Sequence, residues 1–292
     1  MYSREKAFSY AAILEFRNRR CLLLVILLIP LICSSPLAAQ NLPSSSPSSP
    51  SPLQQMLGFG VAGFLGKNDL SYLTLIPPYP ALQSLEDEVD ATVVRQWQSV
   101  DDARWKLAVA DANLSYDRFS EALGHKISSA STPLLFHLLN RVEADMFIVG
   151  PAKSFYGRPR PYQRFQMARV CGFSSAPKAE TSPKTGDSYP SGHTSFGSSV
   201  ALVLAEVAPE RAQIILARGR EYGESRIVCA MHYPSDVHAG EILASSVVGR
   251  LHAVPEFMRE LSCAQEEHAV ALKTRDQLSP DCSNLKHELE RK

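Results

Sequence analysis

The chain has 292 residues, of which 45% are hydrophobic, and its 30 basic side chains balance 30 acidic ones. This balance argues against a nucleic-acid coat protein and against a disordered acidic tail, because both need a strong charge bias. The length is sufficient for one large domain with a buried core.

The N-terminal residues have the pattern of a secretory signal. Residues 1–20 carry five Lys or Arg against two Glu, an apolar stretch runs from Cys21 to Ile32, and small residues follow up to Ala39. The apolar stretch is too short to span a bilayer comfortably, so we predict a signal peptide over residues 1–39, cleaved near Ala39. An uncleaved membrane anchor is the alternative. After cleavage no long apolar stretch remains, and we expect a periplasmic or secreted protein without membrane or nucleic-acid contact.

Three further regions follow the signal. Residues 40–54 are rich in Pro and Ser and predict a linker. Residues 55–262 have a globular composition, and residues 263–292 turn polar and charged, which indicates a C-terminal tail. We therefore expect a single compact domain between a linker and a tail.

The globular region has helical periodicity. Thr132 and Pro133 form a helix start, with a capping side chain followed by a first-turn proline. Apolar residues recur at helical spacing at Leu135, Leu138, Leu139, Val142 and Met146, and again at Val200, Val203, Leu204 and Val207, before Pro209. Two more helical runs cover about 210–223 and 235–251, and alternation typical of strands is scarce. These patterns predict an all-α helical bundle.

Four cysteines remain after removal of the signal. In an oxidising compartment they predict two disulfides, for which three connectivities exist. We favour Cys171 with Cys229 and Cys263 with Cys282. Free, buried thiols are the alternative.

Three short motifs carry candidate chemistry. The first runs from Lys153 to Arg160-Pro161, and the second is Pro190-Ser191-Gly192-His193, directly before the helix that contains Val200. The third has Ser225-Arg226, then His232 and Asp236. Ser191 suits a helix cap, Gly192 allows close approach of a ligand to the backbone, and the N–H groups at a helix start attract an anion. Asp236, one helical turn after His232, can hold one ring nitrogen of that imidazole.

Each motif also has a simpler interpretation. The first could be a solvated basic turn, and the second a capped helix with an incidental histidine. His232, Asp236 and His238 could be metal ligands, but the nearby cations disfavour a divalent ion, so we expect no metal and no cofactor. Glu143 and Asp145 are expected on a solvated helix face rather than in the pocket. The remaining histidines are expected in the core or on the surface: His125, His137, His252, His268 and His287.

Together, the motifs resemble those of the phosphatidic acid phosphatase type 2 superfamily, which includes vanadium haloperoxidases. The order Lys-x6-Arg-Pro, Pro-Ser-Gly-His, Ser-Arg-x5-His-x3-Asp is typical of that family. The run from Gly186 to Thr194 is similar to the signature of bacterial class A non-specific acid phosphatases, with Asp187 as one extra residue. Arg158-Pro-Arg-Pro161 and Pro77-Pro78 also resemble that group. The resemblance extends from about Tyr72 to Leu251 and implies an all-α bundle.

The resemblance implies a role for each motif residue. His232 is expected as the nucleophile, Asp236 as the carboxylate that orients it, and His193 as the acid that protonates the leaving group. The phosphate-binding residues implied are Lys153, Arg160, Ser191, Gly192 and Arg226. Because His193 would begin the reaction protonated, an acid pH optimum is expected.

The expected function is a periplasmic or secreted acid phosphatase that hydrolyses small phosphomonoesters through a phosphohistidine. Its partners would be nucleotides, sugar phosphates and aryl phosphates, and a homo-oligomer is a further possibility. A vanadium-dependent haloperoxidase using the same anion site is one alternative. A non-catalytic phosphate-binding envelope protein is another, and a membrane lipid phosphatase is disfavoured by the absence of spanning segments in the mature sequence.

Overall fold

A computed structural model describes residues 61–179 and 186–291, all of which belong to one unit of the chain, Ser45–Lys292. The predicted signal peptide (1–39) and linker (40–54) lie outside the described residues. Within the described ranges every regular element is a helix, which confirms the all-α prediction. The α-helices are α2 (Tyr72–Leu75), α3 (Leu85–Gln96), α4 (Asp102–Ala110), α5 (Ser120–Leu123), α6 (Pro133–Ala144), α7 (Val149–Tyr156), α8 (Pro161–Arg164), α9 (Gly192–Val207), α10 (Ala212–Val228), α11 (Pro234–Leu251), α12 (Pro255–Ala271) and α13 (Pro280–Glu290). Short 3₁₀ helices are η1 (Trp97–Ser99), η2 (Tyr116–Phe119), η3 (Asp145–Ile148) and η4 (Pro209–Arg211).

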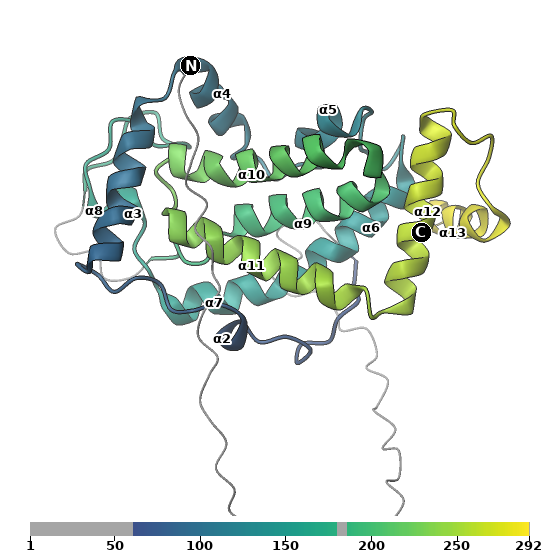
Figure 1. Cartoon of the computed structure of the whole chain (residues 1–292), viewed down its shortest axis with the longest axis horizontal. Coiled ribbons are helices and arrows are strands. Elements are labelled where there is room, and N and C mark those ends of the chain that lie inside the picture. Colours follow the sequence, from purple (N-terminus) through teal and green to yellow (C-terminus); the bar gives the residue numbers. More distant parts are fainter. Residues whose placement is uncertain (1–60, 180–185, 292) are drawn as a thin grey trace, which may run out of the picture. The chain divides into compact units, whose positions relative to one another are not determined.

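The centre of the fold is α9, which lies between α10 and α11 (Figure 1). The apolar side chains that predicted this helix are buried, at Val200, Val203, Leu204 and Val207. Glycines allow the three helices to approach closely. A Cβ at Gly219 of α10 would lie 2.4 Å from Cβ of Ala201, and one at Gly240 of α11 would lie 2.6 Å from the carbonyl oxygen of Ser191. The second turn of α11 is therefore held against the start of α9.

Helix α6 begins where the sequence predicted, but a different residue caps it. Thr132 occupies the N-cap position without a side-chain cap bond. The N–H groups of Leu134 and Leu135 instead donate to the Glu267 carboxylate of α12, at 3.2 and 2.9 Å. Since the first N–H groups of a helix need acceptors, α12 satisfies them from the far end of the sequence.

The C-terminal segment is helical. The predicted boundary after residue 262 falls inside α12, and α13 follows. Cys263 and Cys282 form a disulfide between these two helices, with a Cα–Cα distance of 5.2 Å, and Leu134 of α6 packs against this pair. Among the described residues, none of the helices combines the length and the apolar character needed to cross a bilayer.

Candidate active site

The first motif places two cations on either side of a left-handed turn. Lys153 lies on α7, which ends at Gly157 with a φ of 58°, a conformation that favours glycine. The N–H of Gly157 donates to the carbonyl of Lys153 at 2.9 Å and closes the helix. Arg160 follows as the residue before α8. Both side chains bond to Asp187, so the turn brings them to the same place.

The second motif starts α9. Ser191 is its N-cap residue, and Oγ accepts from the N–H of Thr194 at 3.3 Å, which confirms the predicted cap. Gly192 is the first residue of the helix and faces Lys153, because a Cβ there would lie 3.6 Å from Cε of Lys153. The positive end of the α9 dipole thus lies beside the Lys153 side chain. This combination is favourable for an anion.

The third motif spans the connection between α10 and α11. Arg226 lies in the last turn of α10, and the N–H of His232 donates to its carbonyl at 3.3 Å. Asp236 lies in the first turn of α11, with Oδ2 3.4 Å from Nδ1 of His232. The predicted placement of this carboxylate, one turn beyond the imidazole, is therefore observed.

Backbone hydrogen bonds join the three motifs. The N–H of Ser188 donates to the carbonyl of Arg158 at 3.0 Å, which links the second motif to the first. The N–H of Ser191 donates to the carbonyl of Asp236 at 2.9 Å, which links it to the third. Segments separated by dozens of residues therefore form one site.

The pKa shifts of the two site histidines also indicate that the three motifs converge. Burial lowers the pKa of His232 well below its ordinary value, and the charges of Arg160, Lys153 and Arg226, followed by His193, lower it further. Burial and the same three cations, with Arg226 the strongest of them, lower the pKa of His193 to about 3. Because Coulomb interactions weaken with distance, the imidazoles of His193 and His232 must both lie close to the same three cations. We call Lys153, Arg160 and Arg226 the oxyanion clamp.

The clamp residues repel one another, and they are half-buried at Lys153 and Arg160 and buried at Arg226. Burial, followed by the charge of Arg160, lowers the pKa of Lys153 to about 8. Burial is also the main cause that lowers the pKa of Arg226 to about 10. Among the described residues, Nε of Arg226 is buried without a hydrogen-bond partner. A bound oxyanion would relieve the repulsion and accept from this donor.

The two imidazoles are held by the protein in different ways. Nε2 of His193 lies 3.0 Å from the carbonyl oxygen of Ala112, and since a carbonyl only accepts, Nε2 carries the hydrogen. Nδ1 of His193 is then the nitrogen that can take up and release a proton. Nδ1 of His232 lies 3.4 Å from Oδ2 of Asp236 but makes no hydrogen bond to a described residue, whereas Nε2 lies 3.4 Å from Nη1 of Arg160 and thus faces the clamp.

Asp236 is held in place by Arg158, a residue for which the sequence motifs predicted no role. The Arg158 side chain is 0% exposed, and Nη1 donates to Oδ1 of Asp236 at 2.7 Å. Nη2 donates to Asp90 at 2.9 Å and to Asp87 at 3.2 Å, both on α3. Ser188 donates from Oγ to the other oxygen of Asp236 at 2.5 Å. The first arginine of Arg158-Pro-Arg-Pro161 could have been noticed from the sequence, whereas nothing in the local sequence of Asp87 and Asp90 indicates this arginine as their partner.

Two acidic residues before the first motif differ from expectation. The predicted solvated face for Glu143 and Asp145 is wrong, because both are buried. Glu143 accepts from Oγ of Ser199 at 2.5 Å, and Asp145 accepts from the N–H groups of Phe64 and Leu65 at 2.9 Å. They attach α6 and η3 to α9 and to the segment before α2.

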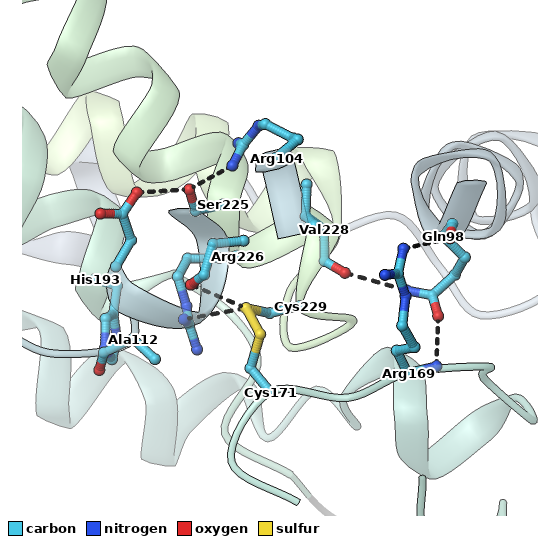
Figure 2. The surroundings of a disulfide bond; sticks show 12 residues. Gln98, Arg104, Ala112, Arg169, Cys171, His193, Ser225, Arg226, Val228 and Cys229 are labelled. Atoms are coloured by element: carbon cyan, nitrogen blue, oxygen red, sulfur yellow. Dashed lines mark hydrogen bonds between the residues drawn. A yellow bond between two sulfur atoms is a disulfide. The ribbon is translucent and has the colours of Figure 1, made fainter. Parts of the chain in front are cut away.

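The first predicted disulfide is formed beside the clamp. Cys171 and Cys229 are bonded, with a Cα–Cα distance of 4.9 Å. Sγ of Cys229 lies 3.6 Å from Nη1 of Arg226, and Figure 2 shows the Arg226 side chain next to this disulfide. The bond therefore attaches the segment after the first motif to the end of α10.

The three residues of the metal-ligand alternative are not grouped together. The exposed His238 side chain pairs with Glu241 at 3.6 Å rather than with His232. In the two described ranges, no three His, Cys, Asp or Glu side chains are grouped so that they could hold a metal ion.

Several known proteins are similar to this chain in sequence. The PAP2 superfamily profile matches residues 134–258. The "Non-specific acid phosphatase" of Providencia stuartii is 37% identical over 204 residues, which cover 68% of this chain and 80% of the relative. The "Acid phosphatase" of Zymomonas mobilis is 37% identical over 200 residues, covering 67% and 74%. For the "Non-specific acid phosphatase" of Salmonella typhimurium the identity is 36% over 170 residues, which cover 56% of this chain, and the chain spans 66% of that relative's length.

Proposed function

The chain belongs to the PAP2 superfamily, and on that premise we propose that it is an acid phosphatase that hydrolyses phosphate monoesters through a phosphohistidine, without a metal ion. The observation that supports this proposal most directly is the convergence of the oxyanion clamp on two imidazoles, of which that of His232 is buried and that of His193 half-buried. Three fixed cations supply the charge that a divalent metal supplies in other phosphoryl-transfer enzymes.

In the first step, Nε2 of His232 attacks phosphorus as the ester P–O bond breaks. The lowered pKa keeps His232 unprotonated and therefore nucleophilic, even in mild acid. The clamp and the start of α9 hold the three equatorial oxygens, whose charge persists through the transition state. His193 donates a proton from Nδ1 to the departing alkoxide.

In the second step, water attacks the phosphohistidine. His193, now neutral, accepts a proton from the water as the P–N bond breaks, which returns both imidazoles to their starting states. Phosphate then leaves the clamp.

The protonation of His193 depends on the substrate. With its pKa at about 3 in the phosphate-free site, His193 is neutral at working pH. A bound phosphate dianion would cancel the repulsion from the clamp and raise this pKa, so that His193 takes up a proton as substrate binds. The acid pH optimum expected from the sequence is therefore proposed as a property of the substrate complex.

The location, the substrate range and the oligomeric state are proposed from the sequence. We propose a periplasmic or secreted location from the signal-like residues 1–39, and nucleotides, sugar phosphates and aryl phosphates as substrates. A homo-oligomer stays a prediction.

Hydrolysis of a panel of phosphomonoesters in acid and neutral buffers tests the function. We expect turnover that resists EDTA and is inhibited by vanadate. The His232→Ala variant should lose at least about 10⁴-fold in kcat, and His193→Ala about 10²–10⁴-fold. The exposed His287, which pairs with Glu290, provides a matched control, because His287→Ala should leave turnover unchanged. Wild-type turnover by His232→Ala would contradict the proposed role, and bromide oxidation with vanadate and peroxide would indicate a haloperoxidase instead.

A further inference from the structure

Asp187 brings a negative charge into the oxyanion clamp. Its carboxylate accepts from Nε of Arg160 at 2.6 Å and from Nη2 at 3.0 Å, and its backbone carbonyl accepts from Nζ of Lys153. Two of the three cations of the clamp are therefore bonded to this one residue. We propose that the Asp187 carboxylate is an internal competitor of the phosphate group, which must leave Arg160 before Arg160 can bind substrate, and which thereby sets the affinity for phosphate.

The geometry of Arg160 makes the competition direct. A guanidinium binds a carboxylate or a phosphate in the same way, with two parallel N–H donors. Asp187 occupies the Nε and Nη2 edge, while Nη1 donates to the carbonyl of Met231 at 3.2 Å and lies beside His232. A phosphate held by two donors from the Nε and Nη2 edge has to replace the Asp187 carboxylate.

The electrostatics match those that a substrate phosphate would experience. The hydrogen bond from Arg160 holds the pKa of Asp187 well below its usual range, and the charges of Arg160 and Lys153 add to this effect. The Asp187 carboxylate is therefore ionised throughout the working pH range. In the phosphate-free protein it partly neutralises a clamp whose cations otherwise repel one another.

The side chain can leave without disturbing the fold. The Asp187 side chain is 64% exposed, in contrast to Asp236, which is fully buried and held by Arg158. The backbone on both sides is anchored, since the N–H groups of Gly186 and Ser188 donate to the carbonyls of Gly157 and Arg158. Rotation of one exposed side chain is sufficient to free Arg160, and the return of Asp187 would favour release of product phosphate.

Removal of this carboxylate should tighten phosphate binding. In the isosteric Asp187→Asn variant we expect the Kd of inorganic phosphate, measured by calorimetry, to fall about fivefold, the effect of one partly exposed ion pair. The KM for an aryl phosphate should fall by a similar factor. Asp102→Asn is the matched control, because this side chain is 93% exposed and lies near Arg169 rather than in the clamp. Its phosphate affinity should equal that of the wild type.

The opposite result would identify Asp187 as a residue that only orients Arg160. In that case Asp187→Asn would bind phosphate more weakly and show a higher KM, and an unchanged Kd would overturn the inference equally. The inference rests on the proposed function, and the two can fail separately. A wild-type protein that binds no phosphate contradicts the proposed function and the inference together, whereas normal wild-type binding without tightening in Asp187→Asn contradicts the inference alone.

Discussion

Replacement of Arg158 by Met tests the buried ion network behind the candidate nucleophile. Arg158 is fully buried, and its guanidinium pairs with Asp87, Asp90 and Asp236. Loss of one partner from a buried ion pair costs about 3–5 kcal/mol, because the remaining charge has neither water nor a counter-ion. For a domain of this size, that loss corresponds to a fall in Tm of about 6–20 °C.

The loss of folding stability in Arg158→Met should depend on pH. Without Arg158 the buried carboxylates acquire raised pKa values and take up protons on folding, so the deficit is largest at neutral pH and shrinks in acid. Unfolding in guanidinium chloride at neutral and acid pH measures the free energy of unfolding directly. The control is Arg220→Met, which breaks an exposed i,i+4 pair with Glu224 and should cost less than about 0.5 kcal/mol. A free energy of unfolding for Arg158→Met within about 1 kcal/mol of the wild type would refute the reasoning.

Three further perturbations have defined outcomes. Reduction of the Cys171–Cys229 bond, or Cys171→Ser with Cys229→Ser, should cost about 2–4 kcal/mol of stability and reduce activity, because Cys229 contacts Arg226; unchanged melting and turnover in dithiothreitol would count against this. KM should rise as the pH passes about 8, where Lys153 loses its charge, and Lys153→Arg should abolish that rise; a flat wild-type profile contradicts the assignment. Burial raises the pKa of Glu143, so Glu143→Gln should become increasingly stabilising, in urea unfolding, as pH rises above about 4.5; equal midpoints at every pH would contradict it.

The parts of the site that could be predicted are those with local signals. Ser191 caps α9 because an N-cap side chain bonds to an N–H three residues later in the sequence. His232 and Asp236 lie together because four residues make one helical turn. The helices themselves followed from apolar spacing, although α10 extends to Val228, beyond the predicted end at 223, and so carries Arg226 in its last turn.

The parts that could not be predicted depend on partners that are distant in sequence. Arg158 meets Asp90 and Asp236 across 68 and 78 residues, and Glu267 caps α6 across 132 and 133 residues. Glu143 has the local sequence of an exposed acid, and its burial follows only from the packing of α6 against α9. Side-chain chemistry shows that such groups need a partner when they are buried, but not which residue supplies it.

The central claim is that His232 carries the phosphoryl group between the ester and water. Rapid mixing with an aryl phosphate, denaturation in alkali and peptide mass spectrometry measure where that group resides during turnover. We expect one phosphoryl group on the peptide that contains His232, in greater amount in His193→Ala, where hydrolysis of the intermediate is slowed, and none in His232→Ala. Turnover without any phosphorylated peptide, or with the phosphoryl group on another residue, would contradict the claim.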